Sequence, residues 1–104
     1  MLYMIANFNF DLTRRSLEQA EAHYLTVHVP LAKRLPGLRH YVIGTNAETK
    51  RIKSEFHRTA ILGFDSLEAL RAAYRSDAGH ALRKDEDDLI EEGRVTLLEG
   101  RVIV

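Results

Sequence analysis

The segment at residues 1–8 (MLYMIANF) is apolar on both of the faces that alternate along a strand. A strand of this kind is typically buried on two sides rather than half exposed. Residues 55–64 (EFHRTAILGF) and 94–104 (RVTLLEGRVIV) are predicted to be strands of the same character. A chain with such strands folds stably only if both faces of its sheet are covered.

The first helix and the second strand are predicted between these segments. The helix begins at Ser16, where Gln19 is placed to complete a capping box, and the Pro-Gly pair at residues 36–37 ends it. Residues 38–45 (LRHYVIGT) then read as a strand, and the polar residues 46–54 (NAETKRIKS) as a loop or hairpin connection.

The second helical segment is predicted in two pieces. The Asp-Ser pair at residues 65–66 offers a cap for the first piece, and the Ser-Asp pair at residues 76–77 starts another that runs to about Ile90. Gly100, inside the last predicted strand, is interpreted as a bulge or a point of close backbone approach.

The resulting order, βαββαβ, predicts a ferredoxin-like α+β fold with a four-stranded antiparallel sheet and both helical segments on one face. The 104 residues form a single domain in this interpretation. Because helices cover only one apolar face, we expect a homodimer that packs sheet against sheet, the arrangement called a dimeric α+β barrel. The alternative is that the strands are short and curl enough to hide little apolar surface.

Composition excludes several classes of function. Fifteen basic residues balance fifteen acidic ones, so no positive field is available to attract nucleic acid or an anionic membrane. The absence of cysteine excludes a disulfide framework, a thiolate nucleophile and cysteine-ligated metals. The segment MLYMIANFNF lacks the features of a signal peptide, and no apolar run approaches the length of a membrane span, so we expect a cytoplasmic protein.

The stretch HVPLAKRLPGLRHY, residues 28–41, contains the main candidate for chemistry. His28 follows Tyr24 at helical spacing, so its ring is predicted to point between helix and sheet. Pro30 cannot donate a hydrogen bond to the carbonyl of Thr26, so the helix must kink or loosen there and open a gap that contains the imidazole and the Tyr24 phenol. The alternative is that His28 is a core residue with its ring nitrogens satisfied.

Three further residues are candidates for binding a substrate. Tyr41 on the second strand is predicted to line the gap with its hydroxyl, or else to be a packed core tyrosine. Asn7, at the end of the first strand, is a candidate donor to a substrate oxygen. His57 in the third strand is a candidate second proton carrier, or a strand-end histidine that meets solvent or the dimer partner.

Metal and nucleotide chemistry have no supporting motif. His23 and His28 diverge on a helix, and no H-E-x-x-H motif occurs. The acidic run at residues 84–92 (KDEDDLIEE) lacks the pattern of a calcium loop and is interpreted as a solvated helical face. No glycine-rich phosphate loop follows any predicted strand. We therefore expect neither a metal nor a cofactor.

The run H-Y-L-T-V-H-V-P-L-A-K-R-L-P-G-L-R-H-Y, residues 23–41, closely resembles the signature of the EthD-like family. That signature is an aromatic residue, then H-x-P-L near the end of the first helix, then L-P-G-L and an aromatic residue in the second strand. The stretch G-F-D-S-L-E-A-L, residues 63–70, is similar to the third strand and second helix start of that family. With the matching order of elements, the resemblance spans nearly the whole chain.

The resemblance implies a dimeric α+β barrel and a site that includes His28, the match to the H-x-P histidine. Some relatives are cofactor-free isomerases, dehydratases or decarboxylases that act on lactones and polyketide-like phenolics; others belong to ether-degradation pathways, and many are labelled reductases. The sequence departs from the family pattern at Leu25, where many members have a second aromatic residue. Asn7 and Asn9 replace the basic residue often found after the first strand.

These observations predict a small cofactor-independent enzyme. His28, kept neutral by burial, takes a proton from a small oxygenated ring compound and returns it elsewhere, as in an isomerase, lyase or dehydratase. Tyr24, Tyr41 and Asn7 orient the substrate or stabilise negative charge on its oxygen. The alternative is a non-catalytic dimeric module that binds a small hydrophobic metabolite or supports a partner enzyme, with a haem-binding variant for which the sequence has no dedicated motif.

Overall fold

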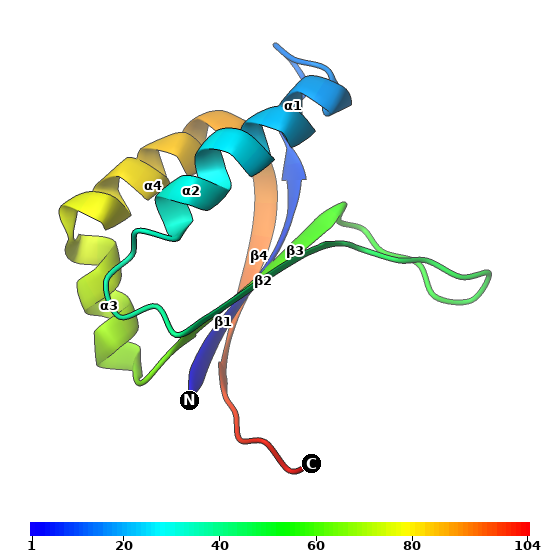
Figure 1. The fold of residues 1–104 in the computed structure, drawn as a ribbon. Helices are drawn as coiled ribbons and strands as arrows, with labels where there is room; N and C mark the ends of the chain where they lie inside the picture. Colours follow the sequence, from blue (N-terminus) through cyan, green and yellow to red (C-terminus); the bar gives the residue numbers. More distant parts are fainter.

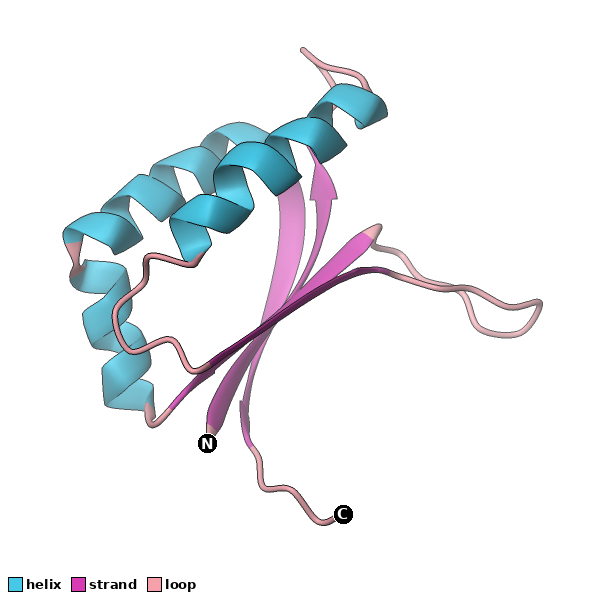
Figure 2. Ribbon diagram, viewed as in Figure 1, coloured by secondary structure: helices cyan, strands magenta, loops and turns pink.

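A computed structural model describes residues 1–104 and places four strands in one sheet, in the order β2-β3-β1-β4. Every neighbouring pair is antiparallel. The helices lie together on one face of the sheet and leave the other face uncovered (Figure 1 and Figure 2). This arrangement confirms the predicted ferredoxin-like α+β fold. The strands are β1 (Leu2–Phe10), β2 (His40–Thr45), β3 (Arg58–Phe64) and β4 (Ile90–Glu99).

The last strand differs most from the prediction of 94–104. β1 continues to Phe10, and Phe10 pairs with Ile90, so β4 begins there. The register between the two strands has one irregularity, between Asn9 and Phe10. At the other end β4 stops at Glu99, which pairs with Leu2, and Gly100 lies just beyond the strand, where its amide donates to the Met1 carbonyl at 3.0 Å. Gly100 is therefore not a bulge, but it is a close-approach point, since a Cβ there would lie 3.1 Å from the Tyr3 ring.

The paired parts of β2 and β3 are shorter than the predicted 38–45 and 55–64. Their ladder ends where Thr45 pairs with Arg58. Beyond that point the Asn46 side chain donates to the Phe56 carbonyl (2.9 Å) and to the Ser54 hydroxyl (3.1 Å). The Asn46 amide also donates to the His57 carbonyl at 2.9 Å, so side-chain and backbone bonds together close the base of the arm formed by residues 46–57, which projects away from the sheet (Figure 1).

The first helical segment consists of α1 (Leu17–His23), a π-helical turn η1 (Tyr24–His28) and α2 (Val29–Ala32). The predicted capping box is present, because the Ser16 hydroxyl accepts from the Gln19 amide and the Gln19 side chain accepts from the Ser16 amide. The helix ends at Ala32, earlier than the predicted Pro-Gly pair. Gly37 lies in the turn that follows, with a φ of 78° that favours glycine.

The second helical segment consists of two pieces, as predicted. They are α3 (Leu67–Arg75) and α4 (Asp77–Leu89). Ser66 and Ser76 cap the two helices through their hydroxyls. Asp65 is not the cap; its carboxylate pairs instead with Arg39 at 3.0 Å. No helix in the structure is both long enough and apolar enough to cross a bilayer.

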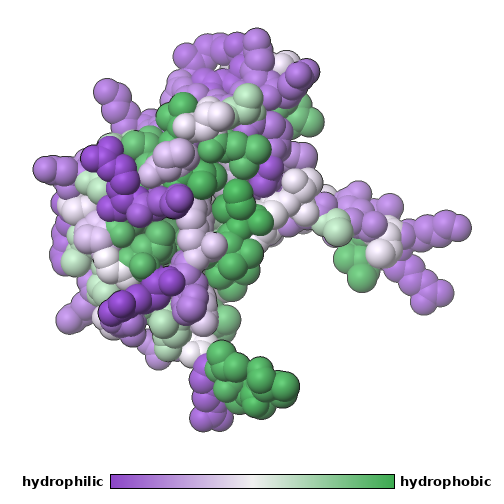
Figure 3. Space-filling model, in the orientation of Figure 1, coloured by the Kyte–Doolittle hydropathy of each residue, from purple (hydrophilic) through white to green (hydrophobic).

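Even-numbered residues of β1 face the helices and odd-numbered residues face the opposite side. Leu2, Phe8 and Phe10 are buried in the core, together with Leu62 and Phe64 from β3. On the uncovered face, apolar side chains gather beside the projecting arm (Figure 3). This open face is formed by apolar residues paired across the sheet: Tyr3, Ile5, Val42, Ile61 and Leu98.

The corner between α3 and α4 depends on a residue without a side chain. A Cβ at Gly79 would lie 2.4 Å from the Ala73 carbonyl oxygen. Gly79→Ala should therefore lower the free energy of unfolding by about 1–3 kcal/mol, because backbone must move to admit the methyl group. Thermal unfolding measures this loss. Gly44→Ala is the control, since a Cβ there meets nothing within 4 Å; equal melting temperatures for the two variants would contradict the prediction.

Candidate active site

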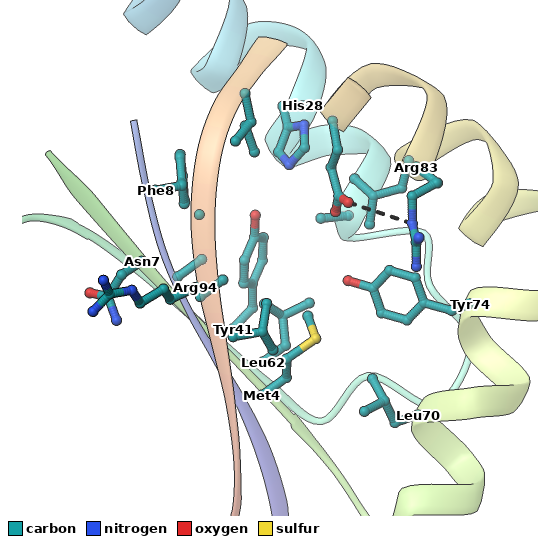
Figure 4. A pocket seen from close by; sticks show the side chains of 18 of the residues that line it. Met4, Asn7, Phe8, His28, Tyr41, Leu62, Leu70, Tyr74, Arg83 and Arg94 are labelled. Atoms are coloured by element: carbon teal, nitrogen blue, oxygen red, sulfur yellow. Dashed lines mark ion pairs between the residues drawn. The ribbon is translucent and has the colours of Figure 1, made fainter. Parts of the chain in front are cut away.

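A cavity of about 520 Å³ lies between the sheet and the helices. Of the 21 residues that line it, 13 are hydrophobic, so a ligand that fills it must be largely apolar. His28, Tyr41 and Tyr74 come from different elements and point toward the interior, whereas Asn7 and Arg94 point away from it (Figure 4). The polar lining residues used below are Tyr24, His28, Tyr41, Tyr74, Arg83 and Glu86.

The π-helical turn places Tyr24 and His28 in this wall. Pro30 has no amide hydrogen, and the Val29 amide bonds to the carbonyl of Tyr24, five residues back, instead of following the α-helical pattern. The predicted loosening of the helix near Pro30 is therefore present as a π turn. Both side chains point inward, with Tyr24 fully buried and His28 6% exposed.

Two side chains, one aromatic and one cationic, pack against the ring of Tyr24. The His28 ring stacks on it with 5.2 Å between centroids and 21° between planes. The Arg58 guanidinium lies 4.8 Å from the centroid of the same ring. The Tyr24 hydroxyl nevertheless has no hydrogen-bond partner. A buried polar group without a partner costs about 1–3 kcal/mol, so this hydroxyl indicates a place for a ligand oxygen.

His28 forms a pair with Asp85 of α4. The imidazole Nδ1 lies 2.8 Å from Asp85 Oδ2, and His23 Nε2 lies 2.7 Å from the other carboxylate oxygen. Because a carboxylate only accepts hydrogen bonds, Nδ1 of neutral His28 carries the proton and Nε2 keeps its lone pair. Burial lowers the pKa of His28, and the hydrogen bond and charge of Asp85 oppose that shift without cancelling it. His28 is therefore a neutral base at pH 7.

Arg58 is buried at the start of β3 and is paired with Glu21 of α1. The Arg58 Nε donates to Glu21 Oε1 at 3.0 Å, and a second guanidinium nitrogen donates to the other carboxylate oxygen. The hydrogen bonds from Arg58 hold the pKa of Glu21 below its ordinary value. The pair fixes a positive charge against the face of the Tyr24 ring.

The phenols of the cavity remain neutral. Burial is the largest cause that raises the pKa of Tyr24, Tyr41 and Tyr74; at Tyr24 the neighbouring Tyr41 hydroxyl and then the Arg58 charge oppose it without cancelling it. The Tyr41 and Tyr24 hydroxyls are close enough to affect each other's pKa, although they do not form a hydrogen bond of good geometry. Both hydroxyls are thus available as donors to an oxygen in the cavity.

Three of the predicted site residues come together and two do not. His28, Tyr24 and Tyr41 share the cavity. Asn7 lies at its edge, but its side chain leaves the opposite face of the sheet (Figure 4), where its Oδ1 accepts from the Thr59 hydroxyl at 2.7 Å. Asn7 has this orientation because odd-numbered residues of β1 face away from the helices. His57 lies outside the cavity, because it precedes β3 and its Nε2 pairs with Glu21 at 2.7 Å.

Asp85 and Glu86 belong to the site, one as the partner of His28 and the other in the cavity wall, although the acidic run around them predicts a solvated helical face. Asp85 contacts His28 across 57 positions of the chain, and no local spacing signals that contact. Helical periodicity within the acidic run was the one available signal, since Leu82 and Leu89, on either side of these residues, are buried. No group of three or more His, Asp or Glu side chains is arranged to hold a metal ion.

The fold and the cavity define a small ferredoxin-like α+β protein with a histidine-carboxylate pair beside an apolar chamber. The family model of the EthD domain matches residues 13–93, and the chain belongs to the EthD family. The resemblance noted from the sequence is thereby confirmed. No curated protein sequence matches the chain with significance.

Solved structures with the same fold include a protein of the ethyl tert-butyl ether D (EthD) family from Bacillus halodurans, 25% identical, with a TM-score of 0.80 over 97% of this chain and 99% of that one. A dimeric ferredoxin-like protein from Thermobifida fusca is 14% identical, with a TM-score of 0.72 over 93% and 88% of the chains. SnoaB, a cofactor-independent oxygenase from Streptomyces nogalater, is 14% identical, with a TM-score of 0.69 over 99% and 95%. The last two similarities establish the fold alone.

Replacing Asp85 with Asn should lower the pKa of His28 further, because the Asp85 carboxylate raises it in the native protein. NMR titration of the imidazole resonances measures the change. Asp77→Asn, at an exposed position at the start of the same helix and outside the cavity, is the control and should leave the His28 titration unaltered. A His28 titration that is identical in Asp85→Asn and wild-type protein would show that the pair does not tune the base.

Proposed function

We propose that this protein is a cofactor-independent enzyme that moves a proton on a small, oxygenated, cyclic or aromatic metabolite of catabolism or secondary metabolism. One observation carries the proposal: the free Nε2 of His28 shares an apolar cavity with the buried, unpartnered hydroxyl of Tyr24. A base beside a hydrogen-bond donor is the arrangement that enolisation of a ketone or lactone needs.

Each polar group of the cavity has a separate role in the proposed reaction. His28 Nε2 accepts a proton from carbon adjacent to the substrate carbonyl, and Asp85 stabilises the imidazolium that forms. Negative charge develops on the carbonyl oxygen, where the Tyr24 and Tyr41 hydroxyls donate hydrogen bonds. The Arg58 charge on the Tyr24 ring favours that donation, because it stabilises negative charge near the phenol oxygen. His28 then returns the proton, or loses it to water.

The similar structures are consistent with chemistry that needs no cofactor. SnoaB is described as a cofactor-independent oxygenase, so this fold hosts at least one reaction of that kind, although its similarity to this chain is one of fold only. We place the reaction in the cytoplasm, as the sequence predicts.

A second candidate is a non-catalytic dimeric protein that binds a small hydrophobic ligand or supports a partner enzyme. The observation in its favour is that Asp85 ties His28 and His23 to α4, a contact that would also stabilise the fold without chemistry. In that case His28→Ala should lower the melting temperature and leave ligand binding intact.

Proton exchange distinguishes the two candidates. In D₂O, wild-type protein should accelerate loss of the α-protons of β,γ-cyclohexenone, followed by ¹H NMR, and His28→Ala should lower this rate by about 100-fold or more. His80→Ala, at an exposed histidine of α4, is the matched control and should exchange at the wild-type rate. If His28→Ala folds and exchanges as fast as wild-type protein, the histidine is structural and the catalytic proposal fails.

The proposal includes a homodimer formed through the open face. Val42 and Leu98 on this face are 56% and 47% exposed, an exposure that apolar side chains lose when a second sheet covers them. Val102, Ile103 and Val104 follow β4 and are also exposed, and they leave the body on the same side as the arm (Figure 3). The Thermobifida fusca protein of the same fold is described as dimeric.

Sedimentation equilibrium at micromolar concentration should give twice the mass of one chain. Ile61→Glu should give the mass of a single chain, because Ile61 pairs with Ile5 and Val42 at the centre of the open face and a glutamate there would be buried without a partner. Leu12→Glu, at a residue that is 48% exposed and outside the sheet, should stay dimeric. A wild-type protein that sediments as one chain contradicts the dimer and leaves the catalytic proposal standing.

A further inference from the structure

Glu86 is a carboxylate of the cavity wall that lies outside the sequence motif of residues 23–41. Its side chain is 28% exposed and lines the same chamber as His28. Its one ion-pair contact is with Arg83 Nε at 3.8 Å, drawn in Figure 4, which is too long for a hydrogen bond. The Glu86 carboxyl therefore remains free to contact a molecule in the cavity.

The groups that face Glu86 come from three helical elements and the sheet. Arg83, Asp85 and Asp87 lie on α4 with it, and both aspartates raise its pKa while Arg83 lowers it. The surrounding elements contribute Tyr74 and Arg71 from α3, Tyr41 from β2 and His28 from η1.

Burial is the largest cause of the raised pKa of Glu86, so its protonated form persists to higher pH than that of an exposed glutamate. The charge of the ionised form would raise the pKa of both Tyr41 and Tyr74. The carboxyl and both phenols line the same cavity, so a substrate that contacts the phenols there also lies beside Glu86.

We infer that Glu86 is the second proton-transfer residue of the cavity, and that it donates a proton to the substrate at an atom other than the one from which His28 removes a proton. The inference rests on the proposed function and narrows it. The substrate class becomes ketones or lactones of two kinds. In one, a double bond is conjugated with the enolate; in the other, a leaving oxygen is attached to the carbon β to the carbonyl. The reaction class becomes isomerisation by a 1,3-proton shift or elimination of water.

The proton balance for a β,γ-unsaturated ketone is complete without a co-reactant. The α C–H bond breaks, its proton goes to His28 Nε2, and the electron pair forms a dienolate whose oxygen accepts from Tyr24 and Tyr41. The Glu86 carboxyl then gives its proton to the γ carbon, a new C–H bond forms, and the α,β-unsaturated ketone results. His28 releases its proton to water, and Glu86 regains one from water.

Two features support separate roles for the two groups. The His28 ring is fixed by Asp85 at Nδ1 and by stacking on Tyr24, so it cannot swing to follow the migrating charge. Glu86 belongs to α4 and has no comparable restraint beyond the long contact to Arg83. A fixed base and a mobile acid suit a reaction in which the two protons move at different carbons.

The test uses β,γ-cyclohexenone in D₂O, where one ¹H NMR experiment follows both α-proton exchange and conversion to α,β-cyclohexenone. Glu86→Gln should slow isomerisation by about 100-fold or more and leave α-exchange at the wild-type rate, because only γ-protonation needs the acid. The wild-type isomerisation rate should fall as pH rises through the pKa of Glu86, and Glu86→Gln should lack that decrease. Glu86→Asp, which keeps an acid, should recover part of the isomerisation.

Controls separate this inference from the proposed function. Glu91→Gln, at an exposed carboxylate after the same helix, should isomerise and exchange as wild-type protein does. If Glu86→Gln isomerises at the wild-type rate with the wild-type pH profile, or if it slows exchange and isomerisation equally, the role of Glu86 is overturned and the role of His28 stands. If wild-type protein accelerates neither process, the proposed function and this inference are overturned together.

Discussion

The missing amide hydrogen of Pro30 is the constraint on which the cavity depends. A proline inside a helix removes one backbone hydrogen bond and crowds the preceding turn, which costs about 3 kcal/mol in a regular α-helix. Here the chain widens into a π turn, in which the Val29 amide bonds to the carbonyl of Tyr24 instead of that of Leu25. The same turn directs Tyr24 and His28 toward the sheet. The helix thus accommodates its proline and gains an inward-facing pair of rings, in keeping with the frequent occurrence of π turns at functional sites.

Tyr24 connects this turn to the electrostatics of the site. Arg58 is only 7% exposed, and a guanidinium buried to that extent needs a partner charge, which Glu21 provides from α1. The guanidinium carbon then lies over the Tyr24 ring, 4.8 Å from its centroid, and no polar group bonds to the Tyr24 hydroxyl. Folding therefore leaves one hydroxyl buried, polarised by a nearby cation and without a partner. A hydroxyl of this kind lowers the stability of the fold when nothing bonds to it. It can donate a hydrogen bond to a substrate oxygen that acquires negative charge during a reaction.

The parts of this site that the sequence could predict are those fixed by local periodicity. Tyr24 and His28 lie four positions apart in one helix, so their shared face followed from spacing, and the disturbance at Pro30 followed from covalent structure. The direction of Asn7 could not be decided, because β1 is apolar on both faces and its alternation does not say which face meets the helices. Strand ends depended on partners far along the chain, as with Glu99 opposite Leu2. The contact between His28 and Asp85 is tertiary and had no local signal.

Asp85 links the stability of the fold to the strength of the base. Its two oxygens contact His23 of α1 and His28 of η1, so one carboxylate of α4 ties the two helical segments together. Burial alone would make His28 a weak base, whereas the Asp85 charge moves its pKa back toward neutrality and a charge on His23 moves it down again. Because the histidines share one acceptor, protonation of His23 also weakens the attraction that Asp85 offers to an imidazolium at His28. Burial therefore sets the direction in which the pKa of His28 shifts, and the position of α4, through Asp85, limits the size of that shift.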